Sequence, residues 1–195
     1  MKEKLLWLPN FGIGYYPVEN SPYDEAYWEK YIKMEDTDIG HQLNQARLEM
    51  VGRYQWDSLI DIGIGSGAFI KELPNSYGFD INPSAVEWLK SVDKFKEPSS
   101  VDCLTFWDSI EHIHNPTELL EKANKFVFIS TPIYDDKAHI LRSKHFRPDE
   151  HCWYFTKDGL IRFMSNFGFY CIEYSNIETE IGREDIGSFV FKRIE

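Results

Sequence analysis

The stretch LIDIGIGSGAF, residues 59–69, decides the fold. An apolar segment comes directly before Gly63, Gly65 and Gly67, and a new apolar pattern begins behind them. Glycine is favoured where the backbone turns sharply or comes close to a ligand, because a Cβ atom would occupy that space. The stretch therefore predicts a strand, a ligand-binding loop and a helix in succession.

Apolar runs and helical patterns alternate on both sides of this stretch. Strands are predicted at 58–62, 77–81, 101–106, 126–130, 170–175 and 188–193, and helices at 38–54, 66–73, 116–125 and after the capping residues Asn82 and Thr156. The strands are continuously apolar, which is typical of a parallel sheet covered by helices on both faces. No helical pattern separates the last two strands, so we expect an α/β fold with a mostly parallel sheet and an antiparallel C-terminal edge strand.

The first 36 residues differ in composition from the rest. Eight aromatic residues lie between positions 7 and 31, with prolines and glycines in the first half of the segment. We predict an aromatic-rich extension over residues 1–36, with a short helix at 24–31, followed by one domain over residues 37–195. Either the aromatic side chains pack the extension onto the domain, or they form a lid or wall over the active site.

Composition excludes several classes of protein. The 195 residues carry a net charge of −11, which repels nucleic-acid phosphate, so a nucleic-acid partner is not expected. Cys103, Cys152 and Cys171 form no CxxC pair, which argues against a disulfide framework and suits the reducing cytoplasm. No apolar run is long enough for a membrane span, and the N-terminal apolar run is too short for a signal peptide, so we expect no membrane partner.

The glycine loop fits two kinds of ligand. As GxGxxA, residues 63–68 match a dinucleotide fingerprint, and as DxGxGxG, residues 61–67 match an S-adenosylmethionine loop. Asp80, 19 positions after Asp61, can hold a ribose in either case. Asp61 discriminates, because its carboxylate would repel a pyrophosphate but pair with an ammonium group. The short remainder of the chain also disfavours a nicotinamide oxidoreductase.

Five segments carry a resemblance to a known family: LIDIGIGSGAFI, YGFDINPSAVEWL, VDCLTFWDSIEHIHNP, KFVFISTPIY and HCWYFTKDGLIRFMSNFGF. Residues 59–175 resemble a class I S-adenosylmethionine-dependent methyltransferase of the ubiquinone-biosynthesis O-methyltransferase group. The resemblance implies a Rossmann-like fold that binds S-adenosylmethionine and releases S-adenosylhomocysteine. By resemblance, the cofactor-binding residues are Asp61, Gly63, Gly65 and Gly67 at the methionine part, Asp80 at the ribose, Ile81 at the adenine, and Trp107 with Asp108 at the end of the 101–106 strand.

One segment departs from the family pattern. Between Leu89 and Val101 the family has a further strand and an acidic loop that contacts the adenine, whereas this chain has only KSVDKFKEPSS. We expect that strand to be shortened or missing. Asp93 is the candidate for the adenine contact.

Two polar clusters supply candidate catalytic residues. In DSIEHIHN, Asp108, Glu111 and His112 fall on one face of a helix or turn, and in the resembling O-methyltransferases such residues can hold a divalent metal. His151 precedes the last long helix and is placed near the acceptor by the resemblance. Glu111, His112 and His151 are the predicted catalytic residues, with His151 as the candidate general base. Each could instead have only a structural role, and metal dependence stays open.

The sequence therefore predicts transfer of a methyl group from S-adenosylmethionine to an oxygen or nitrogen of a small molecule. The aromatic extension keeps open a macromolecular acceptor, since it could form a docking surface or stack bases. The shortened 90–100 segment keeps open a nucleoside-binding module without catalysis. The oligomeric state is not predicted.

Overall fold

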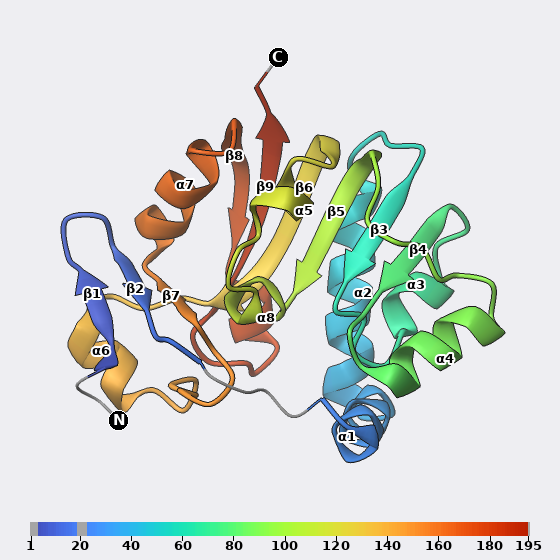
Figure 1. Cartoon of the computed structure of the whole chain (residues 1–195), viewed down its shortest axis with the longest axis horizontal. Coiled ribbons are helices and arrows are strands. Elements are labelled where there is room, and N and C mark those ends of the chain that lie inside the picture. Colours follow the sequence, from blue (N-terminus) through green and yellow to red (C-terminus); the bar gives the residue numbers. More distant parts are fainter. Residues whose placement is uncertain (1–3, 19–22, 195) are drawn as a thin grey trace.

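A six-stranded sheet of order β4-β3-β5-β6-β9-β8 forms the centre of the computed structural model, which describes residues 4–18 and 23–194 (Figure 1). Its strands are β3 (Leu59–Ile62), β4 (Ser76–Phe79), β5 (Val101–Trp107), β6 (Ala123–Pro132), β8 (Phe169–Ser175) and β9 (Ile186–Arg193). The first four are parallel, and β9 runs antiparallel to both β6 and β8. The predicted fold class is confirmed, with β9 inserted beside β6 and β8 at the edge.

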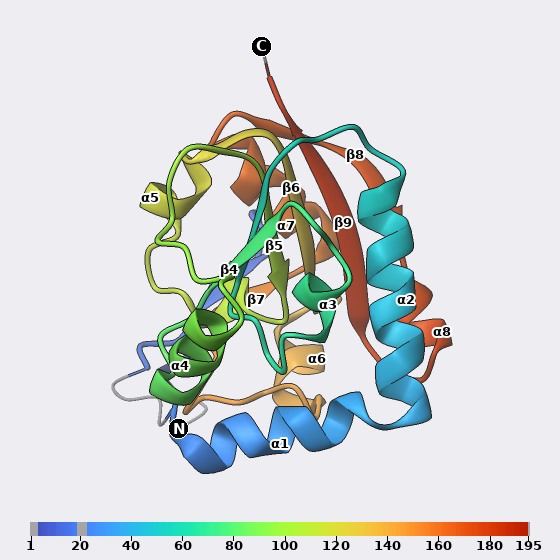
Figure 2. The ribbon, with the colours of Figure 1, turned by 90° about the vertical axis from the view of Figure 1, so that its right-hand side faces the viewer.

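Helices cover both faces of this sheet, and Figure 2 shows α2 and α5 on opposite sides of it. One apolar cluster joins the sheet to α2 (Asp38–Gly52), α3 (Ala68–Lys71) and α4 (Pro83–Ser91) through buried side chains such as Met50, Phe69 and Leu89. A second cluster joins the other face to α5 (Thr117–Leu120) and α7 (Lys157–Ser165). Burial on both faces explains why the strands carry continuous apolar runs.

The helix caps predicted at Asn82 and Thr156 are present, but α2, α3 and α5 are shorter than the helices predicted at 38–54, 66–73 and 116–125. Thr37, Asn82 and Thr156 each accept a hydrogen bond from a backbone N–H in the first turn. The helix predicted at 116–125 ends at Leu120, because β6 begins at Ala123, where the backbone already pairs with β5. The sheet thus takes three residues that the helical pattern had assigned to the helix.

The segment between α4 and β5 contains no strand among the described residues. It makes a single bridge, between Gly78 and Phe95, and the backbone of Lys94 and Lys96 bonds to Gly78 on either side of it. The expected loss of a family strand is therefore confirmed, and β4 is an edge strand of the sheet.

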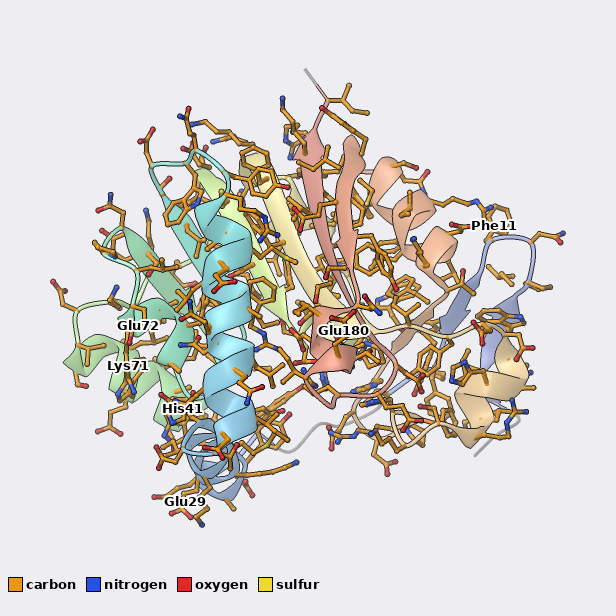
Figure 3. All side chains as sticks on the ribbon, turned by 180° about the vertical axis from the view of Figure 1, so that it is seen from behind. Phe11, Glu29, His41, Lys71, Glu72 and Glu180 are labelled. Carbon is orange, nitrogen blue, oxygen red and sulfur yellow. The ribbon has the colours of Figure 1, made fainter. Side chains whose placement is uncertain are left out.

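The N-terminal segment forms two separate parts. Strands β1 (Leu6–Leu8) and β2 (Ile13–Tyr15) form a hairpin that pairs with β7 (Trp153–Phe155), close to α6 (Lys137–Arg142). Helix α1 (Glu25–Glu35), longer than the predicted 24–31, lies across the carboxyl ends of the parallel strands (Figures 1 and 2). Figure 3 shows Phe11, in the hairpin, far from Glu29 on α1 and His41 on α2.

Two short elements remain, η2 (Ile110–His112) after β5 and α8 (Ile177–Glu180) before β9. No helix within the described residues is both long and apolar enough to span a membrane.

Candidate functional site

A cavity of about 490 Å³ lies where the parallel strands end. This volume falls within the roughly 300–1,000 Å³ typical of small-molecule sites. Six of the eight predicted cofactor residues line it: Gly63, Gly65, Asp80, Ile81, Trp107 and Asp108. The structure thus brings together side chains from the ends of three strands, as expected for ligands at the carboxyl edge of such a sheet.

The glycine loop that follows β3 has a left-handed backbone conformation at its glycines. Gly63 and Gly67 have φ angles of 77° and 82°, which side-chain-bearing residues rarely adopt. A Cβ on Gly67 would also lie 2.3 Å from the Trp88 ring, so this glycine packs under α4 and does not line the cavity. The loop requires glycine at both positions for conformation as well as for space.

Asp80 connects this loop to the end of β4. Its two carboxylate oxygens accept backbone hydrogen bonds from Ile64, at 3.0 Å, and from Asn82, at 2.8 Å. Burial raises the pKa of Asp80, although these backbone N–H groups act in the opposite direction. Each oxygen retains a lone pair, so Asp80 fits the predicted role of accepting ribose hydroxyls.

Asp61 lies beneath the loop rather than on the cavity wall. Its side chain is 1% exposed and accepts a 2.6 Å hydrogen bond from the Thr105 hydroxyl. Burial raises the pKa of Asp61 to about 7, even though Thr105 opposes the shift. The predicted contact of Asp61 with the ligand's ammonium group stays a prediction.

Trp107 supplies an unsatisfied donor at the cavity wall. Its Nε1–H is buried and has no hydrogen-bond partner among the described residues. Arg47, from α2, lies over the indole ring at 5.2 Å from its centroid. No local sequence pattern marks Arg47, so it is not among the predicted site residues.

Asp108 is held by two arginines from distant parts of the chain. Its carboxylate accepts from Arg47 at 2.9 Å and from Arg183 at 2.6 and 2.9 Å, and both arginines also bind Glu178. Burial would raise the pKa of Asp108, but the two guanidinium groups hold it well below its usual range. The backbone of Asp108 has a φ of 54°, a strained conformation that this network stabilises.

The three predicted catalytic residues meet in space. One potential ligand atom from each of Glu111, His112 and His151 lies within 4.8 Å of the others. A backbone hydrogen bond of 2.8 Å from Cys152 N–H to the Glu111 carbonyl brings the two segments together. His112 lines the cavity, whereas Glu111 and His151 lie behind it at 2% and 4% exposure.

This cluster fits a divalent metal by its chemistry. Burial lowers the pKa of His112, and burial together with the neighbouring His112 lowers that of His151 well below its usual range, so both imidazoles are neutral and able to ligate. Burial and the Asp108 carboxylate raise the pKa of Glu111 to about 8. Glu111 Oε2 and His151 Nδ1 have no partner among the described residues. His151, rather than Asp108, is therefore the third group beside Glu111 and His112.

Aromatic residues of α1, with Val18 and Tyr23 before it, line one side of the cavity. Its lining includes Val18, Tyr23, Tyr27, Trp28 and Tyr31. The Tyr27 and Tyr31 hydroxyls lie 3.0 Å apart, and the Tyr23 hydroxyl lies 3.3 Å from His112 Nδ1. The Asn82 amide donates to the Asp24 carbonyl at 2.9 Å, which ties the start of α1 to the segment after Asp80.

The other N-terminal aromatic residues have different surroundings. Tyr16 is buried in a separate cluster with Leu5 and Tyr154, and Tyr15 contacts His114 on the cavity wall through a 3.0 Å hydrogen bond. Aromatic residues near the hairpin therefore pack in a separate cluster, whereas those of α1 line the cavity. A lid function for the extension stays a prediction.

Comparison with known proteins supports the same fold and ligand class. A family model described as "Methyltransferase domain" matches residues 33–174. A search of curated proteins returned no significant match.

Solved structures share this architecture at low identity. A complex between the Haloferax volcanii Trm112 methyltransferase activator and a methyltransferase matches with a TM-score of 0.65 and 16% identity, covering 90% of this chain and 100% of that one. A Thermotoga maritima S-adenosylmethionine-dependent enzyme, titled a possible histamine N-methyltransferase, gives 0.63 and 14%, covering 87% and 98%. Magnesium protoporphyrin IX methyltransferase of Synechocystis with bound S-adenosylhomocysteine gives 0.62 and 14%, covering 88% and 96%.

Proposed function

The chain belongs to the methyltransferase domain family, and we propose that it transfers the methyl group of S-adenosylmethionine to an oxygen or nitrogen of a small-molecule acceptor. The family match and the fold confirm the class I methyltransferase expected from the sequence segments. The small-molecule acceptor is the part of this proposal that goes beyond the family assignment. The volume and the lining of the cavity support it.

The observation that carries this proposal is the wall formed by α1. Tyr23, Tyr27 and Tyr31 line one side of the cavity, and in this proposal they restrict the access of a long polymer. None of the described residues lining the cavity is a lysine or arginine, so a nucleic-acid acceptor would find no cation for its phosphates there. A bounded, largely apolar cavity of this kind suits a small molecule.

The residues of the site have different roles in this proposal. S-adenosylmethionine supplies a methyl group carried on a sulfonium, and Asp80 with the glycine loop holds its nucleoside and amino-acid parts. The chain mainly has to align acceptor and methyl group, and the aromatic wall restricts the acceptor's orientation. His112 is the one predicted catalytic residue that reaches the cavity, so Glu111 and His151 act through it as positioning residues.

A divalent metal would be held by Glu111, His112 and His151. It would stabilise negative charge developing on an acceptor oxygen at this wall. Without a metal, His112 would instead serve as the general base, since its Nδ1–H donates to the Glu150 carbonyl at 3.0 Å and leaves Nε2 free to take a proton.

Calorimetry and radiolabel transfer test the proposal. Purified protein should bind S-adenosylmethionine and S-adenosylhomocysteine, and tritiated methyl groups should pass to molecules that cross a small-pore filter. Binding of NAD without S-adenosylmethionine would reject the cofactor assignment. Label retained only on proteins or RNA would reject the small-molecule acceptor.

One observation favours the macromolecular alternative. Leu6, Leu8 and Phe11 of the hairpin are more than half exposed, and this apolar surface lies on the β1–β2 hairpin rather than on the cavity. A protein acceptor docking there would present its side chain to the cavity from the hairpin side. Label retained on protein in the filtration assay, and lost on changing Leu8 and Phe11 to serine, would support this alternative.

A further inference from the structure

The cluster behind the cavity wall contains buried polar atoms that no described residue satisfies. Glu111 Oε2 and His151 Nδ1 are both buried and unpaired. Leaving such a group without a partner costs about 1–3 kcal/mol. In native proteins, buried polar groups of this kind are normally completed by a water molecule or an ion.

The surroundings of these side chains are those of metal ligands. The His112 Nδ1–H donates to a backbone carbonyl, which fixes the ring and turns the lone pair of Nε2 away from that bond. Metal-bound histidines usually donate their other ring N–H in this way. Cys152 directs both its backbone N–H and its thiol to the Glu111 carbonyl, which holds Glu111 beside His151.

Asp108 is near this cluster but is not available to it. Both of its carboxylate oxygens accept hydrogen bonds from guanidinium groups, and Arg183 binds it through two nitrogens. A cation at Asp108 would displace these bonds and would also be repelled by two positive charges. The spacing in the sequence suggested Asp108, Glu111 and His112 as metal ligands, but Asp108 is therefore not one of them.

We propose that Glu111, His112 and His151 bind one divalent transition-metal ion of the zinc class in preference to magnesium, and that Arg47 and Arg183 exclude Asp108 from its coordination. Two imidazoles and one carboxylate form a donor set typical of zinc, whereas magnesium requires oxygen ligands in octahedral geometry. Three protein ligands would leave room for one further ligand, and of the three only His112 lines the cavity. His112 is then a ligand rather than the general base.

Metal binding can be measured without methyl transfer. Protein stripped with a chelator is titrated with zinc and with magnesium by calorimetry, and with cobalt by its visible absorption. We expect one zinc ion per chain, bound at least about 100-fold more tightly than magnesium, and a cobalt spectrum of a nitrogen- and oxygen-ligated site. No zinc binding, or equal affinity for magnesium, would overturn the proposal while leaving the methyltransferase assignment intact.

Variants locate the ion. Glu111→Gln and His151→Asn should each weaken zinc binding at least about 100-fold, since each removes one of three ligands. The matched controls are His114→Asn and His139→Asn, which should bind zinc as the wild type does. His114 lies on the same wall but is bonded to Tyr15, and His139 lies between Asp135 and Asp185. Zinc binding that survives both cluster variants, or that is lost in His139→Asn, would assign the ion elsewhere.

Asp108→Asn tests the exclusion of Asp108. Because this carboxylate is not a ligand, the variant should bind zinc within about 3-fold of the wild type, even if the loss of an ion pair lowers its melting temperature. Zinc should raise the melting temperatures of the wild type and of Asp108→Asn, but not that of His151→Asn. A loss of zinc affinity as large as that of His151→Asn would make Asp108 a ligand and overturn the exclusion.

Discussion

The two walls of the cavity are built in different ways. The wall of the glycine loop comes from neighbouring segments, with Gly63 and Asp80 only 17 positions apart and Ile64 bonded directly to Asp80. The opposite wall joins Tyr23 to His112 across 89 positions of the chain. The first wall is a local structure attached to two adjacent strands, and the second exists only when the whole domain has folded.

The difference extends to the polar groups of each wall. On the glycine-loop wall, Asp80 is bonded to two backbone N–H groups, so its geometry is set before a ligand arrives. Behind the opposite wall, Glu111 and His151 carry polar atoms without partners. We infer that the loop wall is adapted to one constant ligand and that the opposite wall determines what else is bound.

The largest effect that we expect is a pH dependence of stability caused by Asp61, the buried acid beneath the glycine loop. The Asp61 pKa is about 7 in the folded protein and 3.8 in the unfolded chain, so the folded state binds one more proton between about pH 4 and 7. The contribution of Asp61 to the free energy of unfolding is fully present below pH 4 and is lost as the pH rises to 7. The loss is on the order of 4 kcal/mol at most. Asp61→Asn removes this titration.

Urea unfolding of the wild type and Asp61→Asn at pH 5 and pH 8 measures the effect. The wild type should lose stability relative to the variant on going from pH 5 to pH 8. A constant difference between the two proteins would mean that Asp61 is ionised throughout and that the loop wall is not organised around a buried neutral acid.

Asp80→Ala should weaken binding of S-adenosylhomocysteine by about 2–3 kcal/mol, or roughly 100-fold in the dissociation constant, because in its proposed role Asp80 forms charged hydrogen bonds to the ribose. Asp93→Asn is the control. Asp93 does not line the cavity, so the variant should bind normally, and the adenine contact of Asp93 stays a prediction. A weaker Asp93 variant would show that the 90–100 segment moves onto the ligand.

Gly67→Ala should destabilise the protein by about 2 kcal/mol, because alanine is disfavoured at a φ of 82° and its Cβ would meet Trp88. Gly52→Ala is the matched control, since a Cβ there has nothing within 4 Å, and it should be neutral or slightly stabilising. Melting temperatures compare the two. Equal effects would mean that the loop tolerates a side chain and that its glycine spacing carries little structural information.

Tyr15→Phe should have the smallest effect on stability. Its effect on function should concern only the wall opposite the glycine loop. The bond between Tyr15 and His114 is exposed, so its loss should cost at most about 0.5 kcal/mol of stability. We expect an unchanged affinity for S-adenosylhomocysteine, measured by calorimetry, and a change only in the Michaelis constant for the acceptor. A weakened nucleoside affinity would show that the two walls are coupled.

Several predictions made from sequence are confirmed by the structure because they concern local hydrogen bonds. The caps at Asn82 and Thr156, the turn after β3 and the missing strand at 90–100 each depend on residues a few positions apart. The predicted end of the 116–125 helix at Lys125 was wrong, since α5 ends at Leu120 and pairing of β6 with β5 begins at Ala123. The strands β1, β2 and β7 were not predicted, because three-residue strands leave too short a pattern to recognise.

The sequence by itself determined the fold class, the glycine loop and the position of Asp80, because hydrophobic periodicity and turn chemistry act over short distances along the chain. Only the tertiary structure decided which polar groups meet. Arg47 and Asp108 are 61 positions apart, Asp108 and Arg183 are 75, and His151 reaches Glu111 through the pairing of distant segments. Those contacts depend on how the whole sheet folds. They bind Asp108 to two arginines and bring His151, already predicted as catalytic, beside Glu111 and His112.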